Sequence, residues 1–399
     1  MMEFHKIELN NNDGTICINF WGDFVWKEKQ HILFKDGKLN EILSDELVNN
    51  IHKSDCNVIN LEAPVTECTK SIFKPGAPCL KSPAEAVRFL KSFPNLVLSG
   101  ANNHIYDYGE NGIFDTLNFA SEENIRTVGF GKNMTEAKIP IVICCNENKI
   151  GILSYAQHEF SIAENDQAGA NPYDPLEVFD EIKWMKQNCD AVIVLFHIGC
   201  EHYQYPTPNM QKICRKMVLC GADLILCQHS HCIGSREIFD NGEILYGQGN
   251  FIFDWLDLPC WESGFLVRVT FDKKLKIEYI PMKYEKNGTK RLMTAEEKKE
   301  ALEVFEKRSN VCRYPEKVSC EWEKFCLDPY KYSSFITGSI LGFHNRYILA
   351  IDRRLHNILA NWILKNPARR LLLWNFFSCE SITEMMKTIL HDSPKKKQE

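Results

Sequence analysis

The chain has 399 residues, of which 44% are hydrophobic and 25% are charged, and its formal net charge is -6. This length accommodates one large α/β domain with an appendage, or two domains, and the composition is that of an ordinary globular protein. The negative net charge argues against a general nucleic-acid-binding protein, which is usually basic, so we expect no nucleic-acid partner.

The 17 cysteines form no regular framework and include no Cys-x-x-Cys pair. This pattern predicts buried free thiols in a reducing cytosol and gives no support for a structural zinc site of that type. The N-terminal sequence MMEFHKIELNNNDG has no apolar core of signal-peptide length. No uninterrupted apolar run approaches the ~18 residues of a membrane span. We therefore expect a cytoplasmic protein.

The first two predicted strands are each followed by a carboxylate. Residues 15–20 predict a strand, and Asp23 lies just beyond it. Residues 57–61 predict a second strand, which leads directly to Glu62 and is ended by Pro64. A Gly-Asp pair is also common in turns, so Asp23 by itself does not indicate a site.

The third predicted strand leads into an Asn-Asn-His sequence. A helix with Ser82 as its N-cap precedes the strand, which covers residues 96–98. Asn103 and His104 follow the strand, and Asp107 lies just before the next predicted helix. An Asn-Asn-His sequence is also compatible with a plain polar turn.

The middle of the chain predicts a hairpin over residues 139–145 and 149–155, around an Asn-Glu-Asn turn. The loop that follows, 157–175, contains few apolar residues, and we expect it to border the site as a lid. An amphipathic helix over 175–188 comes next.

Two apolar runs that end on histidine follow this helix. Residues 191–196 lead to His197, and residues 223–227 lead to His229 and His231. The helical pattern between them predicts a strand–helix–strand unit, whose parallel strands have their C-terminal ends at one sheet edge. Open α/β sheets bind ligands at that edge. A single histidine there is usually an ordinary core or surface residue, but three in this arrangement indicate a site.

Beyond His231 the sequence predicts a hairpin and a final antiparallel pair of strands. Asn250 lies between them in the sequence Gly-Gln-Gly-Asn-Phe, whose two glycines allow a close approach of the backbone. We expect Asp107, Glu201 and Asn250 to support the site or to bind substrate.

The character of the sequence changes beyond residue 285. Thr294 caps a predicted charged helix that continues to Arg308, and residues 335–390 have helical character. We expect a domain over residues 15–285, a connecting segment with the charged helix over 286–334, and a helical C-terminal extension over 335–390.

The C-terminal extension contains a cationic segment. Residues 345–370 include one acidic residue, Asp352, and six basic residues: Arg346, Arg353, Arg354, Lys365, Arg369 and Arg370. An apolar run follows at 371–377. The extension could make peripheral contact with an anionic membrane, or it could pack on the main domain or on a partner.

Six side chains near predicted strand ends form one set of candidate metal ligands: Asp23, Glu62, Asn103, His197, His229 and His231. Oxygen and nitrogen donors without thiolate suit Mn, Fe or Zn better than calcium. One or two divalent ions there would activate a water and stabilise the oxygens of a displacement at phosphorus. His104, next to Asn103, is the candidate catalytic acid that protonates the leaving oxygen.

In their order along the chain, the motifs resemble those of the CapA family of poly-γ-glutamate capsule-biosynthesis proteins. The resemblance rests on Gly22-Asp23, Asn60-Leu61-Glu62-Ala63-Pro64, Asn102-Asn103-His104, His197-Ile198-Gly199-Cys200-Glu201, Gly221-Ala222-Asp223, Gln228-His229-Ser230-His231 and Gly247-Gln248-Gly249-Asn250. It covers about residues 15–285 and implies an α/β fold, a four-layer α/β/β/α sandwich of the calcineurin-like metallophosphoesterase type.

The resemblance also implies how the ligands are divided between two metal ions. Asp23, Glu62 and His231 would surround one ion, and Glu62, Asn103, His197 and His229 the other. Metallophosphoesterases usually have Asp-x-His in the first motif, where this chain has Asp23-Phe24-Val25, and Asp where this chain has Glu62. Both differences weaken the first position, so a site with one metal ion remains open.

The leading interpretation is a CapA-like, metal-dependent hydrolase acting on a phosphoester or an anionic polymer precursor in capsule or surface-polymer biosynthesis. The alternative is a non-catalytic accessory protein that binds poly-γ-glutamate or another capsule-synthesis protein, such as a synthase. Amide-bond hydrolysis or transfer on glutamyl polymers is a third interpretation. The complete ligand set favours an enzyme, because a purely structural subunit would not need it.

Overall fold

A computed structural model describes residues 3–74, 77–253, 258–328 and 346–367, together with residues 369, 370, 373 and 377. The chain divides into two compact units, Met1–Trp322 and Glu323–Glu399. The domain boundaries expected near residues 285 and 335 stay predictions. None of the cysteines in the described ranges takes part in a disulfide.

One sheet of the first unit carries the N-terminal strands. Its order is β17 (Lys290–Leu292), β16 (Lys274–Tyr284), β15 (Ser263–Asp272), β2 (Ile16–Phe24), β3 (Cys56–Leu61), β4 (Leu96–Ser99) and β5 (Arg126–Val128), and β14 (Asn250–Ile252) pairs with the end of β2. Strands β2 to β5 are parallel, whereas β15 and β16 form the antiparallel pair that the sequence predicts.

The second sheet carries the two histidine-bearing strands. Its order is β1 (His5–Leu9), β7 (Ile141–Cys145), β8 (Asn148–Ala156), β10 (Ala191–His197), β11 (Leu224–Gln228), β13 (Gly242–Leu245) and β12 (Arg236–Phe239). The hairpin of β7 and β8 is confirmed. So is the strand–helix–strand unit, because β10 and β11 are parallel and α7 (Pro208–Leu219) connects them.

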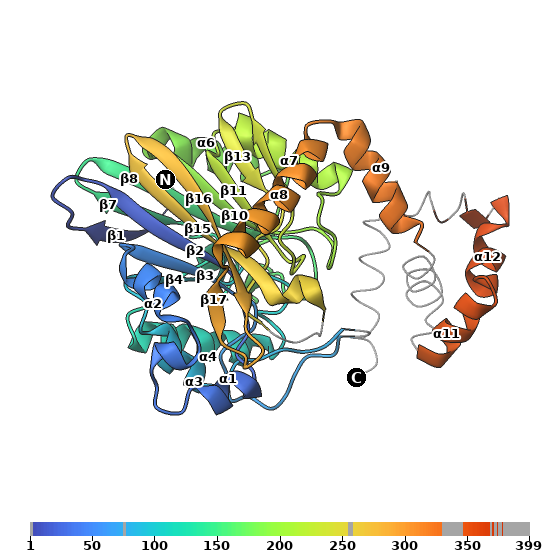
Figure 1. Ribbon diagram of the computed structural model, residues 1–399, viewed down its shortest axis with the longest axis horizontal. Helices are drawn as coiled ribbons and strands as arrows, with labels where there is room; N and C mark the ends of the chain where they lie inside the picture. Colours follow the sequence, from blue (N-terminus) through green and yellow to red (C-terminus); the bar gives the residue numbers. More distant parts are fainter. Residues whose placement is uncertain are drawn as a thin grey trace. The chain divides into compact units, whose positions relative to one another are not determined.

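Three hydrophobic clusters define four layers. Helices α2 (Asp45–His52), α3 (Glu85–Leu90) and α4 (Gly109–Glu122) cover the outer face of the first sheet, and α6 (Val178–Asn188) and α7 cover the outer face of the second. The third cluster, which includes Phe20 and Ile193, fills the space between the sheets. Figure 1 shows α6 and α7 above the sheets and α2 to α4 below them. The expected α/β/β/α sandwich is thus confirmed.

Eight further elements are described up to Cys326. They are α1 (Glu28–Leu33), η1 (Leu39–Glu41), β6 (Phe130–Gly131), α5 (Met134–Ala137), β9 (Gly169–Ala170), η2 (Pro259–Glu262), α8 (Ala295–Cys312) and α9 (Pro315–Cys326). The small strands β6 and β9 pair with each other in antiparallel fashion.

Two local expectations were wrong. Helix α3 begins at Glu85 with Ala84 as its N-cap, and Ser82 does not cap it. The hydroxyl of Ser82 instead accepts a hydrogen bond from the backbone N–H of Trp26, at 2.9 Å. Strand β2 continues through Asp23, because β14 pairs with its final residues. A long-range contact decided the local structure in both places.

Helix α8 is the charged helix that the sequence predicts, and it packs on the first unit. The Thr294 hydroxyl accepts from the backbone N–H of Glu297, whose carboxylate accepts from the backbone N–H of Thr294. This capping box fixes the start of the helix. Phe305, 1% exposed, joins the cluster between the two sheets.

The second unit contains α11 (Arg346–Arg354) and α12 (Ile358–Leu364), which lie within the expected helical extension. Most of the apolar run 371–377 and the Pro-Lys-Lys-Lys sequence near the C-terminus lie outside the described residues. Within the described parts of the chain, no helix is both long enough and apolar enough to cross a membrane.

A substitution in α8 tests how much the packing of this helix contributes to the stability of the first unit. We expect Phe305→Ala to lower the free energy of unfolding by about 3–5 kcal/mol, because it leaves a cavity between the sheets. The neighbouring Val304→Ala is the control and should stay within about 0.5 kcal/mol, since Val304 is 47% exposed. Urea unfolding followed by circular dichroism measures both, and equal effects would contradict the packing of Phe305.

Candidate metal centre

The six candidate ligands lie together where strands of the two sheets end. Asp23 is near the end of β2, Glu62 follows β3, Asn103 follows β4, His197 ends β10, and His229 and His231 follow β11. None of the six is more than 6% exposed. The parallel order of these strands brings their C-terminal ends to one edge, which is why residues far apart in the sequence meet.

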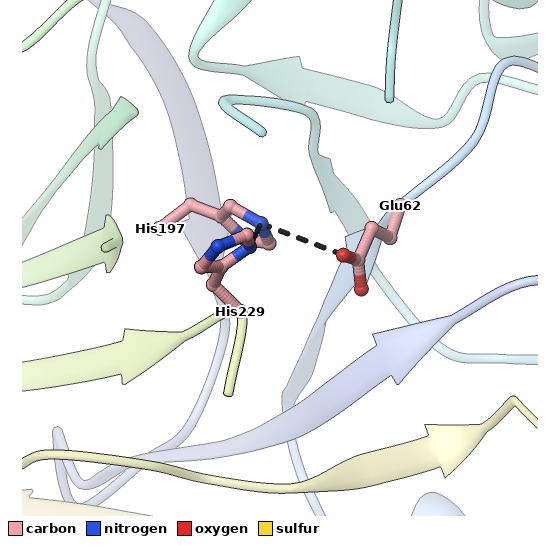
Figure 2. A group of neighbouring side chains, drawn as sticks. All are labelled: Glu62, His197 and His229. Atoms are coloured by element: carbon pink, nitrogen blue, oxygen red, sulfur yellow. Dashed lines mark hydrogen bonds and ion pairs between the residues drawn. The ribbon is translucent and has the colours of Figure 1, made fainter. Parts of the chain in front are cut away.

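One group of donors is centred on the imidazole of His197. Its Nε2 lies 3.4 Å from Glu62 Oε1, 3.1 Å from His229 Nδ1 and 3.0 Å from Asn103 Oδ1. Figure 2 shows the two imidazoles side by side, with the carboxylate of Glu62 facing His197. Two nitrogens and two oxygens therefore gather around His197 Nε2, and the ligand atoms of Glu62, His197 and His229 lie within 4.8 Å of one another, a spacing that suits a divalent ion.

A second group shares Glu62 with the first. The Nδ1 of His231 lies 3.1 Å from Asp23 Oδ2 and 3.0 Å from Asn250 Oδ1, and its Nε2 lies 3.6 Å from Glu62 Oε1. Asp23, Glu62 and His231 have ligand atoms within 4.8 Å of one another. Asn250 is therefore placed to orient His231, and Glu62 is the carboxylate common to both groups.

Three carboxylate oxygens of this site have no hydrogen-bond donor in the described part of the chain, and a bound cation would suit them. Glu62 Oε1, Glu62 Oε2 and Asp23 Oδ2 are buried and accept no hydrogen bond from a described residue. Burial, and secondly the charge of Asp23, raises the pKa of Glu62 well above its usual range. Burying such groups without a partner is costly, and a divalent ion removes that cost.

Two of the histidines, His197 and His229, have pKa values that favour the neutral form a metal needs. Burial lowers the pKa of His197 well below its usual range, and the neighbouring His229 and His231 lower it further. Burial also lowers the pKa of His229. Neutral imidazoles at neutral pH have a lone pair available for a metal ion.

The backbone around the ligands adopts unusual conformations. His229 and His231 have positive φ angles of 100° and 55°, which non-glycine residues rarely adopt. A Cβ atom on Gly22 would lie 1.9 Å from the carbonyl oxygen of Gly249. The close approach expected from the two glycines before Asn250 is thus the contact between β14 and β2. Strain of this kind is typical of functional sites.

The candidate acid His104 forms a buried cluster next to the ligands. Its Nδ1 lies 2.6 Å from Asp107 Oδ2, and Lys74 Nζ donates to Asp107 Oδ1 at 2.7 Å. Lys74 also donates to the backbone carbonyl of Asn103, at 3.0 Å. Burial lowers the pKa of His104, while the hydrogen bond with Asp107 opposes this shift. His104 and Asp107 are therefore together, as the sequence suggested.

Glu201 is the one expected site residue that lies outside these clusters. It is exposed, and its charge is one of the causes that raise the pKa of Glu62. The structure brings the other expected residues into the contacts described above: Asp23, Glu62, Asn103, His104, Asp107, His197, His229, His231 and Asn250. Glu201 is therefore linked to the site through the effect of its charge on Glu62 and His229.

The sequence assigned no role in the site to three polar residues that support it. Asn60 Nδ2 donates to Asp23 Oδ1 at 2.7 Å and lies 3.4 Å from His197 Nδ1. Lys74 holds Asp107. Glu159 accepts from Asn103 Nδ2 at 3.0 Å, and its other oxygen lies 3.7 Å from His229 Nε2. Glu159 comes from the 157–175 loop, so this loop does border the site. The position of this loop was the one sequence feature that pointed toward Glu159.

Glu159 provides a test of how the ligands are supported. We expect Glu159→Gln to weaken the binding of Mn²⁺ or Zn²⁺ by about 10–100-fold, because a carboxylate beside a metal-binding imidazole orients the ring and raises its basicity. Asp166→Asn, an exposed change in the same loop, is the control and should not alter affinity. Competition with a fluorescent chelator measures both, and unchanged affinity in Glu159→Gln would contradict the role of Glu159.

The raised pKa of Glu62 predicts a pH effect in the metal-free chain. Above a pH of about 4.5 the unfolded chain loses this proton while the folded chain retains it, so stability falls as pH rises. Glu62→Gln should remove this contribution and stabilise the metal-free chain at pH 7 by about 1–3 kcal/mol, while abolishing metal-induced stabilisation. Urea unfolding at pH 5 and pH 8, with and without metal, tests it. A less stable metal-free variant would contradict the expectation.

Known proteins have sequences similar to about half of this chain. It is 31% identical to the PGA biosynthesis protein CapA of Bacillus subtilis over 214 residues, which cover 50% of this chain and 54% of that protein. It is 32% identical to the capsule biosynthesis protein CapA of Bacillus anthracis over 181 residues, 44% of each chain. The matched region thus spans about half the length of these relatives.

More distant matches extend over a longer region. A probable polyglutamine synthesis accessory protein of Mycobacterium tuberculosis is 26% identical over 241 residues, which cover 57% of this chain and 61% of that protein. Among solved structures, a hypothetical protein from Thermus thermophilus covers 67% of this chain and 99% of its own, with 10% identity and a TM-score of 0.42. The family model of the bacterial capsule synthesis protein PGA_cap matches residues 17–255, and the chain therefore belongs to this family, as the CapA-like motifs predicted.

Proposed function

We propose that the chain is a metal-dependent hydrolase that acts on a phosphoester or an anionic polymer precursor in capsule or surface-polymer biosynthesis. The observation that carries this proposal is the buried carboxylate of Glu62, which has no hydrogen-bond donor among the described residues and is shared by two groups of metal-binding side chains. The names of the Bacillus relatives supply the biosynthetic context.

The residues would divide between two positions. Asp23, Glu62 and His231 would hold one ion, and Glu62 with Asn103, His197 and His229 would hold the other. The mixed nitrogen and oxygen donors suit Mn, Fe or Zn. A divalent ion in such a site supplies a Lewis acid and a nucleophilic water at neutral pH.

His104 is the proposed acid for the leaving group. With Nδ1–H donated to the Asp107 carboxylate, Nε2 is the atom that would give a proton to the departing oxygen, and this requires the protonated imidazolium form of His104. Lys74 balances the charge of Asp107 and holds the backbone of Asn103 at the same time. One buried cation therefore keeps the acid and a metal ligand in a fixed relation.

A second candidate function is that of a non-catalytic accessory protein, which binds poly-γ-glutamate or another capsule-synthesis protein. The name of the Mycobacterium tuberculosis relative favours it, since that protein is described as a synthesis accessory protein. The two candidates differ in whether the metal site turns over a substrate.

Two histidine variants test the proposed enzyme. His229→Ala should lower both metal content and hydrolysis of an aryl phosphate, because it removes a ligand. His104→Ala should keep the metal and lose a factor of about 10²–10⁴ in rate, the usual contribution of a general acid. The loss should shrink for a nitrophenyl leaving group, which needs no proton. His52→Ala, on the exposed side of α2, is the control.

Elemental analysis and initial rates measure these outcomes. If His104→Ala empties the site of metal, His104 is a ligand and its assignment as the acid is wrong. If none of the variants changes a measurable turnover while polymer or partner binding persists, the accessory function is correct instead.

A further inference from the structure

A cavity of about 750 Å³ lies beside the metal centre and is not used by the chemistry proposed above. Its lining comes from the loop after β10, from η2 and from one face of α8, and it includes His202, Cys260, Lys283, Glu297, Val304 and Arg308. A cavity of this size accommodates a ligand of several residues or rings.

Trp261 separates the cavity from the metal centre. It follows the cavity residue Cys260, and its ring centroid lies 4.2 Å from that of His231 and 5.9 Å from that of His202. The backbone N–H of His202 donates to the carbonyl of Ser230, at 2.9 Å, between the two histidine ligands of this turn. One aromatic ring therefore lies between a residue of the cavity and a ligand of the metal centre.

Arg308 lines this cavity with a guanidinium group that lacks an ion-pair partner among the described residues. Its Nε is buried and has no hydrogen-bond partner, and the guanidinium makes no ion pair with any described residue. Burial lowers the pKa of Arg308. Arg308 is half-buried, and a buried N–H without an acceptor is costly to keep, whereas a bound anion would accept from it and offset this cost.

The other charged residues of the cavity already have partners or are exposed. Lys283 Nζ lies 3.1 Å from Glu297 Oε1, and Arg291 Nη1 lies 2.6 Å from Glu297 Oε2. Glu297 is thus held by two cations and is not available to Arg308. Glu300 also lines the cavity, but it is exposed at the rim. The charge that remains inside is positive.

The neighbouring face of α8 fixes Arg308 in place. Phe305 packs between the sheets, the Ser309 hydroxyl accepts from the backbone N–H of Arg236 at 2.9 Å, and the carbonyl of Cys312 accepts from Gln211 Nε2 at 2.7 Å. These contacts lie on both sides of Arg308 along the helix. The helix segment that carries Arg308 is therefore fixed before a ligand arrives, which reduces the backbone entropy lost on binding.

We propose that this cavity binds a carboxylate group of a polyanionic substrate chain through Arg308, while the bond to be cleaved lies at the metal centre. The inference rests on the proposed function for the class of substrate. A guanidinium binds a carboxylate with two parallel hydrogen bonds, which a lysine cannot reproduce. The cavity would thus select a substrate by a charged group remote from the reacting bond.

Calorimetric titration of the full chain tests this proposal, with a γ-linked glutamate pentamer as the probe. The protein is first dialysed against a chelator, so that binding is measured without metal. Arg308→Ala should weaken binding by about tenfold to a hundredfold, because charge-assisted hydrogen bonds are lost. Arg308→Lys should recover only part of the affinity. Arg313→Ala, which removes an exposed cation at the end of the same helix, should bind like the unaltered chain.

A second variant leaves Arg308 in place. Val304→Glu puts an acid at a cavity position that is 47% exposed, where a charge is tolerated by the fold, and it should weaken binding to a similar extent. Unaltered binding in both Arg308→Ala and Val304→Glu would overturn the proposal. Displacement of the pentamer by an equal concentration of inorganic phosphate would overturn the assignment to carboxylates.

The result is separable from the test of the proposed function. Once metal is restored, Arg308-dependent binding of the pentamer by a chain that hydrolyses neither the pentamer nor an aryl phosphate would support the cavity and contradict the enzyme. Hydrolysis of the pentamer by Arg308→Ala with an unchanged KM would support the enzyme and contradict the cavity.

Discussion

The burial of one carboxylate, Glu62, is the constraint on which the site depends. It lies at the end of β3, fully buried, with imidazoles of both ligand groups within 3.6 Å and without a hydrogen-bond donor among the described residues. In the metal-free chain such a group opposes folding, because the ionised form is poorly solvated. The same isolation gives a cation its strongest electrostatic attraction. Stability and metal binding therefore place opposite demands on this position.

The two sheets bring the ligands together at the C-terminal ends of their parallel strands. β10 and β11 of one sheet present the histidines, while β2, β3 and β4 of the other lead to the oxygen donors. β14 connects the two halves, since it pairs with β2 and brings Asn250 to His231. A Cβ atom on Gly22 would meet the carbonyl oxygen of Gly249, and one on Gly249 would meet the carbonyl oxygen of Ser263, so neither position has space for a side chain. Precise donor placement thus depends on backbone packing as much as on the ligands themselves.

The surroundings of the metal centre come from segments that carry no ligand. The 157–175 loop contributes Glu159, and residues before α3 contribute Lys74, each of which holds a ligand or the candidate acid. On another side, α8 contributes Arg308 to a cavity that Trp261 separates from His231. If the substrate is a polyanion, these two regions act on different parts of it. The metal centre would hold the reacting group, and the cavity would hold a remote charge.

The sequence by itself determined the parallel pair that carries the histidines and the six candidate ligands, whereas the layered α/β/β/α arrangement was implied by the resemblance of its motifs to the CapA family. Short, continuous apolar runs of the kind found in buried parallel strands lead directly to polar donors. Parallel strands bring their C-terminal ends to one edge, so these donors are expected together. The tertiary structure alone decided that Ser82 binds the backbone of Trp26 and does not cap α3, and that β2 continues through Asp23. It alone placed Lys74, Glu159 and Arg308, because isolated charged residues in loops and on a helix have no sequence pattern that reveals which distant groups they meet. Local patterns fix elements and the ends of strands, whereas contacts between remote segments are decided by how the layers pack.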